Sequence, residues 1–510
     1  MCPAAVSQTL ASARLVRRIS SVSLLSLFEP SLRGRAAERA LEWQDQIFTF
    51  GEIDAWSNRI ARELADRGLA AGDRLALYLP NRPEYIALVL GCLKAGVIVV
   101  PINVLYKERE AAHIVNDAAP RAVVVEGTAP APGAHAWRLD ALMGNAAGRD
   151  AAPIGSHVSS ESPAALIYTS GTTGAAKGAV LTHGNFAANA ATLVEAWRLG
   201  EGDRLLLALP LFHVHGLGNG VMCWLACGCL ARLLPRFEQQ SAAAQFIRFR
   251  PTVFFGVPTM YVRLAEALQS ESAGDRLRNV RLFCCGSAPL APETFHAFAA
   301  ATGHQILERY GMTETGMLLS NPYAGERLPG TVGTPLPGVA LRIVDRDDNE
   351  LPAGEEGELH VRGSNVFAGY WRDAAKTAES FAVDDDGNRW FRTGDLGRVD
   401  PATGHVTLLG RGRELILRGG FNVYPREVEE VLELFPAVRE AAVVGRPHPE
   451  WGEVPVAFLV VEVEVEVDEA ALLAHCAAEL ARFKLPVAFR YVEALPRNAL
   501  GKVQKHLLPP

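Results

Sequence analysis

The chain has 510 residues, of which 49% are hydrophobic and 21% charged, and its formal net charge at pH 7 is −7. This length exceeds what one hydrophobic core usually holds, so we expect two or more domains. The negative charge supplies no basic field for nucleic acid, and no apolar run is long and charge-free enough to span a bilayer. The eight cysteines form no regular framework, which favours a reducing compartment.

The first 28 residues contain Arg14, Arg17 and Arg18, many serines and no acid. This composition fits an organelle transit peptide, whereas the lack of a clear amphipathic stripe favours a flexible start. We therefore expect residues 1–28 to be a flexible extension of a cytoplasmic protein, with the mitochondrial matrix as the alternative. A monomer and a homodimer both remain open.

Strands alternate with helices over the first half of the chain. A helix is expected at Phe48–Arg67, where apolar residues recur at helical spacing. A strand, a helix and two further strands are expected in turn at Asp73–Leu79, Glu84–Ala95, Val97–Ile102 and Ala122–Val125. This alternation indicates a mostly parallel sheet covered on both faces. Residues 127–160 are rich in Ala, Gly, Pro and Ser, and we expect loop and weak structure there.

The second half of the chain changes in character twice. Strands followed by possible binding loops are predicted first, at Arg204–Leu209, Thr252–Val257 and Val280–Cys285. Shorter strands then predict a β-rich subdomain, at Leu341–Val344, Glu358–Arg362 and Val406–Leu409. The last part reads as a compact α+β unit of about 100 residues. We expect an α/β fold with a large N-terminal domain at 29–410, a hinge at 411–413 and a mobile C-terminal lid domain at 414–510.

The segment Tyr168–Gly178 has the composition of a polyphosphate cradle. It follows a strand-like run and precedes a predicted helix at His183–Trp197. Its glycines allow close approach of the backbone to an anion, its hydroxyl groups donate hydrogen bonds, and Lys177 adds a positive charge. The spacing differs from that of the P-loop, Gly-x4-Gly-Lys-Ser/Thr. A polar loop that only turns the chain is the plainer alternative.

Six further motifs follow in the chain, and two of them carry groups suited to ATP chemistry. Tyr310–Gly316 offers an aromatic ring for a purine, a donor at Thr313 and a carboxylate at Glu314 for Mg²⁺. Trp390–Gly397 places Asp395 where it can accept from ribose hydroxyls. Two histidines, His213 and His215, follow a strand, and small residues follow another at Cys285–Pro289. Gly419–Gly420 and Lys502 belong to the last domain.

These motifs, in this order and rough spacing, resemble those of the acyl-adenylate-forming superfamily, and in particular its AMP-binding acyl-CoA synthetases. The resemblance extends roughly from Phe48 to Lys505. It implies an ATP-dependent acid:CoA ligase that uses ATP, Mg²⁺ and coenzyme A. A carboxylate attacks the α-phosphorus, pyrophosphate leaves, and the thiolate of coenzyme A then displaces AMP. Because one face of the large domain serves both steps, the small domain is expected to rotate about the position of Arg413.

The resemblance also implies a role for each matched residue in binding ATP. The phosphates are held by Thr169, Ser170, Gly171, Thr172, Thr173, Gly174 and Lys177. Tyr310 flanks adenine beside Gly286, Ser287, Ala288 and Pro289, and Gly311, Met312 and Thr313 are further cofactor-binding residues. Asp395 and Arg411 bind ribose, and Glu314 with Thr169 ligates Mg²⁺.

The remaining implied roles concern the acid and coenzyme A. His213 orients the acyl carboxylate, and Lys502 bridges it to the α-phosphate. Gly419 and Gly420 let the pantetheine arm pass close to the backbone. His213, Glu314, Thr169 and Lys502 form the implied catalytic set.

Among these enzymes the chain most resembles the malonyl-CoA synthetases, which implies malonate or methylmalonate as the acid substrate. The likeness rests on five segments: His213-x-His215-Gly216, Val280–Leu282, Leu307–Glu314, Gly419–Pro425 and Pro496–Asn498. A second carboxylate needs a cation in an otherwise apolar pocket, and we expect Arg281 to supply it, with His215 as second donor and Arg236 in reserve. Leu318–Leu319, where many of those enzymes have a polar pair, favours the alternative of a fatty or aryl acid. A third possibility is an adenylation enzyme that loads a carrier protein.

Overall fold

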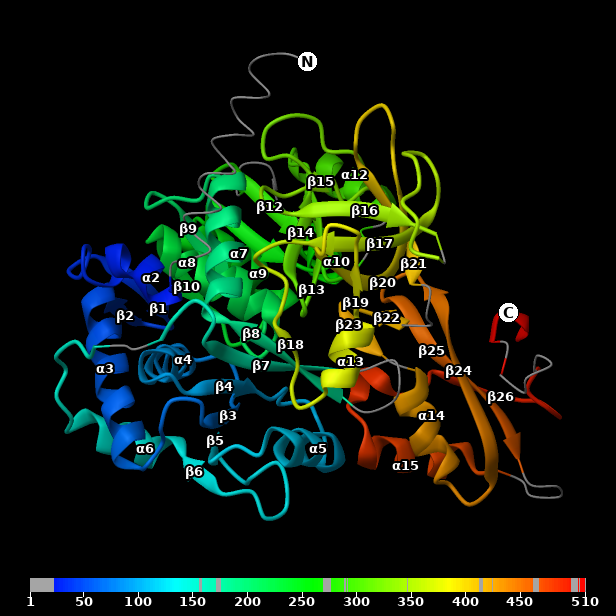
Figure 1. Cartoon of the computed structure of the whole chain (residues 1–510), viewed down its shortest axis with the longest axis horizontal. Helices are drawn as coiled ribbons and strands as arrows, with labels where there is room; N and C mark the ends of the chain where they lie inside the picture. The colour runs from blue at the N-terminus through cyan, green and yellow to red at the C-terminus, as the bar shows by residue number, and fades with distance from the viewer. Residues whose placement is uncertain are drawn as a thin grey trace.

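The computed structural model describes residues 23–155, 158–170, 176–268, 277–288, 290, 292–345, 347–411, 416–423, 425–461, 467–496, 503 and 505–509 (Figure 1). Four sheets organise this part of the chain. Two large sheets and one smaller sheet form the N-terminal part, and the fourth belongs to the C-terminal part. The expected mixed α/β architecture is confirmed.

The first large sheet has seven strands in the order β18-β8-β7-β4-β3-β5-β6. Its parallel strands are β3 (Arg74–Tyr78), β4 (Ile98–Pro101), β5 (Ala122–Val125), β6 (Ala136–Arg138) and β7 (Pro163–Ser170). Two antiparallel strands, β8 (Ala176–Thr182) and β18 (Gly369–Tyr370), complete one edge. Every residue of β4 and β5 is buried, as expected for parallel strands covered on both faces.

The second large sheet has nine strands in the order β15-β14-β13-β12-β11-β9-β10-β1-β2. Its parallel strands are β1 (Arg39–Trp43), β9 (Arg204–Leu207), β10 (Leu230–Leu233), β11 (Val253–Gly256), β12 (Leu282–Cys285) and β13 (Leu307–Met312). Three antiparallel strands lie at the edges: β2 (Gln46–Thr49), β14 (Gly316–Ser320) and β15 (Thr334–Pro335). The carboxyl ends of β9, β11, β12 and β13 therefore meet at one edge of this sheet.

Helices form layers with the two large sheets. The first and largest core cluster joins both sheets to a set of helices: α2 (Leu24–Leu32), α3 (Phe50–Asp66), α4 (Pro83–Ala95), α6 (Leu139–Ala147), α7 (His183–Ala196) and α8 (Cys223–Cys227). A second cluster packs the nine-stranded sheet on α9 (Gln239–Phe249), α10 (Pro258–Leu268) and α12 (Pro292–Thr302). A further cluster packs the seven-stranded sheet on α5 (Glu108–Ala118). Each large sheet is thus covered on both faces.

Local sequence explains where several of these helices begin. Thr49 caps α3 in a capping box with Glu52, and Thr182 and Asn185 do the same for α7. Helix α4 begins with Pro83 and ends at Gly96, which has a φ of 70°. The predicted helices at these places are confirmed to within about two residues at each end.

The smaller sheets follow in chain order. The β-rich subdomain consists of β16 (Ala340–Val344), β17 (Gly357–Arg362), β19 (Phe381–Val383), β20 (Arg389–Val399) and β21 (Val406–Arg411), and helix α13 (Ala374–Glu379) precedes β19. The C-terminal sheet consists of β22 (Ile416–Arg418), β23 (Phe421–Val423), β24 (Val438–His448), β25 (Gly452–Val461) and β26 (Ala488–Tyr491). Its helical segments are α14 (Pro425–Glu433), α15 (Glu469–Glu479), η2 (Arg482–Lys484) and η3 (Lys505–Leu507). This sheet has its own two core clusters.

Two expectations about the first third of the chain are wrong in part. Helix α2 begins at Leu24, and both Leu24 and Phe28 are fully buried, so residues 24–28 belong to the folded part rather than to an extension. Residues 127–160 contain β6 and helix α6, which packs on α3 through Leu139 and Leu142. The rest of the proposed extension, residues 1–22, and the hinge residues 412–413 lie outside the described residues.

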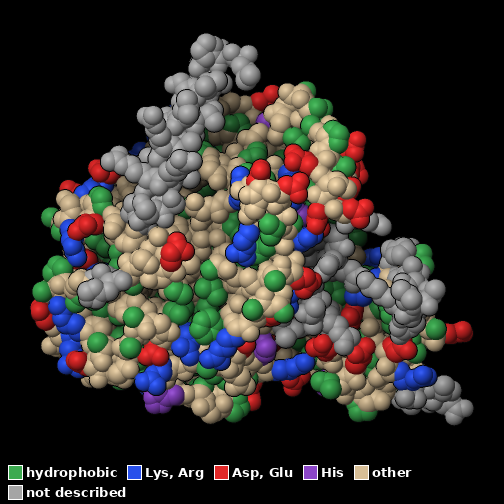
Figure 2. All heavy atoms as spheres, in the orientation of Figure 1, with side chains coloured by type: hydrophobic (Ala, Val, Ile, Leu, Met, Phe, Trp, Pro, Cys, Tyr) green, Lys and Arg blue, Asp and Glu red, His purple; other side chains and the backbone are tan. Residues whose placement is uncertain are grey.

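The described residues share three general features, which concern surface charge, helix length and cysteine burial. Charged side chains of both signs are interspersed over the face in Figure 2. None of the helices described is long and apolar enough to cross a membrane. All seven described cysteines are buried.

Candidate active site

The loops after the parallel strands of the nine-stranded sheet bring several predicted residues together. His213 and His215 follow β9, Gly286 and Ser287 follow β12, and Tyr310 lies near the end of β13. His215 opens a short π-helix, η1 (His215–Met222), which carries its ring back toward β12. Convergence at the carboxyl ends of parallel strands is where open α/β sheets place their sites.

His215 is the centre of a buried polar cluster that also contains Arg309 and Ser287. Its Nδ1 lies 3.0 Å from Ser287 Oγ, and its Nε2 contacts Nη2 of Arg309. A guanidinium can only donate, so Nε2 must accept and the imidazole proton belongs on Nδ1, from which it reaches Ser287. The hydroxyl proton of Ser287 is then available to another acceptor.

The two histidines are held in the neutral form. Burial, then the charge of Arg309 and the neighbouring His213, places the pKa of His215 well below its ordinary value. Burial and Arg309 also lower the pKa of His213 to about 4. The backbone N–H of His215 donates to Nδ1 of His213 over 3.2 Å. The two rings therefore act near neutral pH as uncharged hydrogen-bonding groups.

Arg309 is a buried cation whose charge acts on the buried carboxyl of its chain neighbour Glu308, the pKa of which burial raises to about 7. Arg309 is 2% exposed, its Nε has no hydrogen-bond partner, and no ion pair joins it to any carboxylate in the described part of the chain. Its guanidinium lies against Gly286, where an added Cβ would be 2.4 Å from Nη1. Ser287, next in the chain, has a φ of 71°, a conformation that costs non-glycine residues of order 1–3 kcal/mol. Packing therefore holds the strained backbone of Ser287 next to a guanidinium that forms no ion pair with the described residues.

The two arginines expected to meet a second substrate carboxylate are elsewhere. Arg281 precedes β12, at the amino end of that strand, and its Nε and Nη2 lie 2.8 and 2.6 Å from the two carboxylate oxygens of Asp203. It also donates to the carbonyls of Trp197 and Arg198. Arg236 is exposed and pairs with Glu238. Both assignments are corrected: Arg281 is engaged at the opposite end of the strand, and Arg236 faces solvent.

A second cluster gathers around Glu314 and contains the described part of the phosphate cradle. Thr169 Oγ1 donates to Glu314 Oε1 over 3.3 Å, and the hydroxyl of Tyr370 donates to the same oxygen over 3.0 Å. Nζ of Lys177 lies 5.9 Å from the centre of the Tyr370 ring. Burial lowers the pKa of Lys177. One carboxylate and a hydroxyl, supplemented by substrate phosphates, are a typical oxygen donor set for Mg²⁺, so these residues fit that ion.

Tyr310 and Asp395 form the third cluster. The hydroxyl of Tyr310 donates to Oδ2 of Asp395, although the two residues belong to different sheets. Tyr310 is 8% exposed, so the ring proposed for a purine is largely buried. Asp395 lies in the long strand β20 rather than on a tight turn, and its backbone is paired with that of Arg411 in β21. The two residues proposed for ribose are thus cross-strand neighbours.

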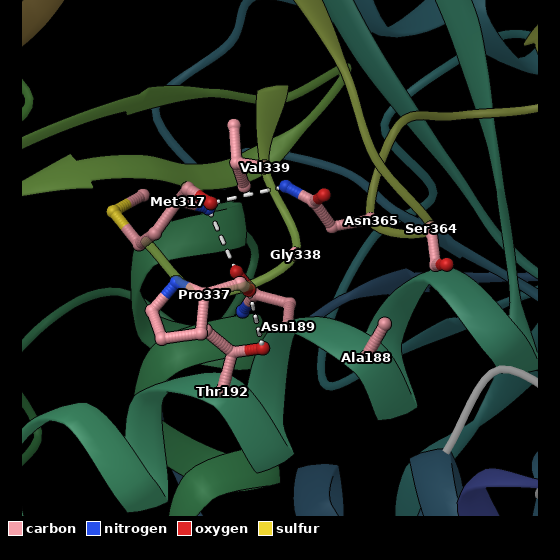
Figure 3. Close-up of a pocket in the computed structure, with 9 residues that line it drawn as sticks. All are labelled: Ala188, Asn189, Thr192, Met317, Pro337, Gly338, Val339, Ser364 and Asn365. Carbon is pink, nitrogen blue, oxygen red and sulfur yellow. Dashed lines mark hydrogen bonds between the residues drawn. The ribbon is translucent and has the colours of Figure 1, made fainter. Parts of the chain in front are cut away.

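Two asparagines fix the hairpin that carries Tyr310 and Glu314. Oδ1 of Asn189 accepts from the backbone N–H of Met317 over 2.7 Å. Nδ2 of Asn365 donates to the carbonyls of Thr315 and Met317 over 2.7 and 3.0 Å. Figure 3 shows both asparagines around a small cavity between α7, β14 and the loop at Pro337. The cavity has room for about one water molecule, so we regard it as packing behind the hairpin.

The C-terminal domain places its glycine pair against the same edge. A Cβ on Gly420 would be 3.2 Å from Val257, directly after β11, and one on Gly419 would be 2.7 Å from the ring of Trp451. Both glycines have positive φ values, 57° for Gly419 and 87° for Gly420. Close approach and backbone conformation both require glycine at these positions.

Several predicted residues lie outside the described part of the chain. These are Gly171, Thr172, Thr173, Gly174, Pro289 and Lys502, together with the side chains of Ser170 and Arg411. Of the remaining adenine segment, Thr313 is buried and Gly311 and Met312 are half-buried in the hairpin. Their proposed roles stay predictions.

Sequence reasoning missed Arg309, Tyr370, Asn189 and Asn365. A signal existed for Arg309, because Glu308 and Arg309 place two charges in a strand that must be buried on both faces. Tyr370 and the asparagines carry no such signal, since their partners are 56, 128 and 48 residues away in the chain.

Comparisons with known proteins agree with this arrangement. Residues 28–371 match the family model described as AMP-binding enzyme, and residues 427–502 match that of the AMP-binding enzyme C-terminal domain. A sulfoacetate–CoA ligase from Cupriavidus necator is 35% identical, over 93% of this chain and 96% of its own length. A malonate–CoA ligase from Arabidopsis thaliana is 34% identical, over 86% of this chain and 78% of its own length.

Two solved structures are informative because their identities are nearly equal. ATP-bound MatB from Rhodopseudomonas palustris is 38% identical, with a TM-score of 0.71 over 95% of this chain and 98% of that chain. A malonyl-CoA ligase with methylmalonyl-CoA and AMP bound is 37% identical, with a TM-score of 0.81 over 92% of this chain and 99% of that chain. The whole-chain arrangement is therefore nearer to that of the product complex.

Proposed function

The chain belongs to the AMP-binding enzyme family and is an AMP-forming acid–thiol ligase, and from this premise we propose that its acid substrate is malonate or methylmalonate. Malonyl-CoA, AMP and pyrophosphate would be the products. The family requires ATP, Mg²⁺ and coenzyme A, so only the acid is left to assign.

Arg309 is the observation that carries this proposal. An unpaired guanidinium inside a protein is costly, and an arginine buried in this way is normally met by a carboxylate or phosphate. A planar guanidinium donates two parallel hydrogen bonds to a carboxylate, and the free proton of Ser287 Oγ can supply a further hydrogen bond. Malonate would bring the missing charge, whereas acetate or a fatty acid would leave Arg309 uncompensated.

The proposal depends on the second anionic group of the acid, and not on the length of its carbon chain. Two of the relatives are named for malonate and for sulfoacetate, acids that both carry a second anionic group on the α-carbon. A sulfonate has a third oxygen that needs a donor. His215 Nε2 faces Arg309 as an acceptor and cannot supply one. We therefore favour the planar carboxylate, with sulfoacetate as the competing substrate.

The other clusters would serve the nucleotide. Thr169 and Lys177 would contact the phosphates, and Glu314, oriented by Tyr370, would hold Mg²⁺. When bound, Mg²⁺ neutralises phosphate charge. Asp395, held by Tyr310, would accept from the ribose hydroxyls. Lys502 would contact the attacking carboxylate and the α-phosphate, so that the chain contributes mainly positioning and charge stabilisation.

Substitution of Arg309 tests the proposal directly. Arg309→Met should lower kcat/KM for malonate. The corresponding activation free energy should rise by about 2–5 kcal/mol, the usual cost of stranding one partner of a buried charged pair. Arg309→Lys keeps the charge but loses bidentate geometry, and its activity should be intermediate. Turnover of acetate should change little or improve. Arg309→Met also leaves Nε2 of His215 without its donor, so the free energy of unfolding should fall by about 1–3 kcal/mol.

Arg281→Met is the matched control. It removes an arginine next to the neighbouring strand but leaves the polar cluster intact, so it should lower stability through Asp203 without changing the preference among acids. Wild type and the three variants would be compared on malonate, methylmalonate, sulfoacetate, acetate, octanoate and a cinnamate. Preference of the wild type for octanoate or cinnamate would refute the malonate proposal and leave a fatty or aryl acid ligase. Acid-dependent pyrophosphate exchange without AMP release on adding coenzyme A would indicate carrier-protein loading.

A further inference from the structure

The ammonium group of Lys484 is buried between the N-terminal and C-terminal parts of the molecule. Lys484 ends the short helix η2, and its side chain is 2% exposed. Its Nζ lies 2.5 Å from Oε1 of Glu110, in helix α5, and 2.6 Å from Oε1 of Glu427, in helix α14. Figure 1 shows α5 next to the C-terminal helices. One cation therefore joins a carboxylate of each part.

The surroundings keep this ammonium charged and in place. The ring of Tyr106 lies 4.6 Å from Nζ, a cation–π distance. Burial opposes charge on Lys484, but Tyr106, Glu427 and Glu110 raise its pKa above the ordinary value. Glu110 and Glu427 have side chains that are 6% and 16% exposed. The other described ion pairs between the two parts, Arg109–Glu430 and Arg263–Glu450, are more exposed, so they contribute less.

Lys484 is also connected mechanically to the glycine pair. Nη1 of Arg418 donates to the carbonyls of Phe483 and Leu485, the two neighbours of Lys484 in the chain. Arg418 directly precedes Gly419 and Gly420, and Gly420 lies against Val257 of the N-terminal part. An unbroken path of contacts thus leads from Glu110 through Lys484 and Arg418 to the glycine pair.

We propose that Lys484 is a positioning residue for thioester formation, which holds Gly419–Gly420 at the carboxyl end of β11 through its contact with Glu110. In this role Glu427 is its permanent partner, because both belong to the C-terminal domain. Glu110 is the partner that a rotation of that domain would exchange for water. The contact stabilises one arrangement of the domains and is absent from any other, so it biases the equilibrium between them. This arrangement is the one nearer to the relative with methylmalonyl-CoA and AMP.

Glu110→Gln is the variant that isolates this contact. Glu110 also caps α5, where its Oε2 accepts from the backbone N–H of Lys107 over 3.0 Å. Glutamine keeps one carbonyl oxygen for that cap and replaces the oxygen that faces Lys484 by an NH₂ group, which cannot accept from the ammonium. Lys484 keeps Glu427 in this variant, so the C-terminal domain is not left with an unpaired buried cation. Glu108→Gln is the matched control, since Glu108 is an exposed acid in the same first turn of α5.

The two half-reactions would be measured separately in the full-length enzyme. The acid used would be whichever one the wild type ligates fastest, so that the outcome does not depend on the malonate assignment. Acid-dependent ATP–pyrophosphate exchange reports adenylate formation, and single-turnover reaction of supplied acyl-adenylate with coenzyme A reports thioester formation.

Glu110→Gln should slow thioester formation about tenfold or more, while pyrophosphate exchange stays within about twofold of wild type or rises. Glu108→Gln should leave both rates unchanged. Lys484→Met should reproduce the same selective loss, with a lower melting temperature because it strands Glu427 as well. Equal loss of both half-reactions in Glu110→Gln, or an unchanged thioester step, would overturn the proposal.

Discussion

Alanine in place of Gly286 provides a stringent test of the acid site, because the structure predicts which substrates it affects. The backbone of Gly286 is not in the left-handed region, so alanine is tolerated conformationally and its effect is steric. The added Cβ would lie 2.4 Å from Nη1, 2.5 Å from Cζ and 2.8 Å from Nε of Arg309. Ordinary contact between such atoms is about 3.5 Å, so the guanidinium must move by about 1 Å.

Arg309 cannot make this movement freely. It is buried, and Nη2 is held by His215. A displacement of about 1 Å at a positioning group can cost about 10²-fold in rate. We therefore expect the ratio of kcat/KM for malonate to that for acetate to fall about 10²-fold in Gly286→Ala. Overpacking should also lower the free energy of unfolding by about 1–3 kcal/mol.

The assay is steady-state release of AMP with malonate or acetate as the varied acid and ATP and coenzyme A saturating. Gly202→Ala is the control, because Gly202 is exposed and a Cβ there would meet nothing within 4 Å. If Gly286 only supports adenine, both acids should lose activity by the same factor. Equal losses, or an unchanged malonate rate, would therefore refute the contact between Gly286 and a substrate-binding Arg309.

Two further predictions concern Lys502 and His183. Lys502→Ala should slow adenylate formation about 10²–10³-fold and still convert supplied acyl-adenylate to thioester, the reverse of the pattern expected for Glu110→Gln, and equal loss of both steps would argue for a structural role. Burial lowers the pKa of His183 to about 4, so its contribution to stability is present above the unfolded value of 6.5 and is lost as the pH falls toward 4. The free energy of unfolding in urea should therefore fall less between pH 7.5 and pH 5 in His183→Phe than in wild type. The difference should be up to about 1.4 kcal/mol per pH unit below 6.5. Equal decreases in the two proteins would contradict this prediction.

Most of the fold could be predicted because its signals are local. The apolar runs at β4 and β5 and the capping box of α3 are visible in the sequence, and the structure places them as expected. Helix α6 could not be predicted in this way. Its segment is rich in alanine and glycine, and its burial on α3 depends on a partner far away in the chain. The same holds for residues 24–28. Their apolar side chains are buried because helix α2 packs on α8, which begins only at Cys223.

The candidate site shows the same division. The loops that we propose for the site could be recognised in the sequence, because Thr169, Glu314, His215 and Asp395 belong to motifs whose residue types suit this chemistry. The motifs did not indicate which arginine is available for the acid, and our proposal of Arg309 comes from the structure. Arg281 and Arg309 both lie beside buried strands, but Arg281 precedes its strand and Arg309 lies within one. The structure pairs Arg281 with Asp203 and gives Arg309 no ion pair within the described residues. The sequence could not show this, because a buried strand has two covered faces and its residues do not tell which neighbour lies on each.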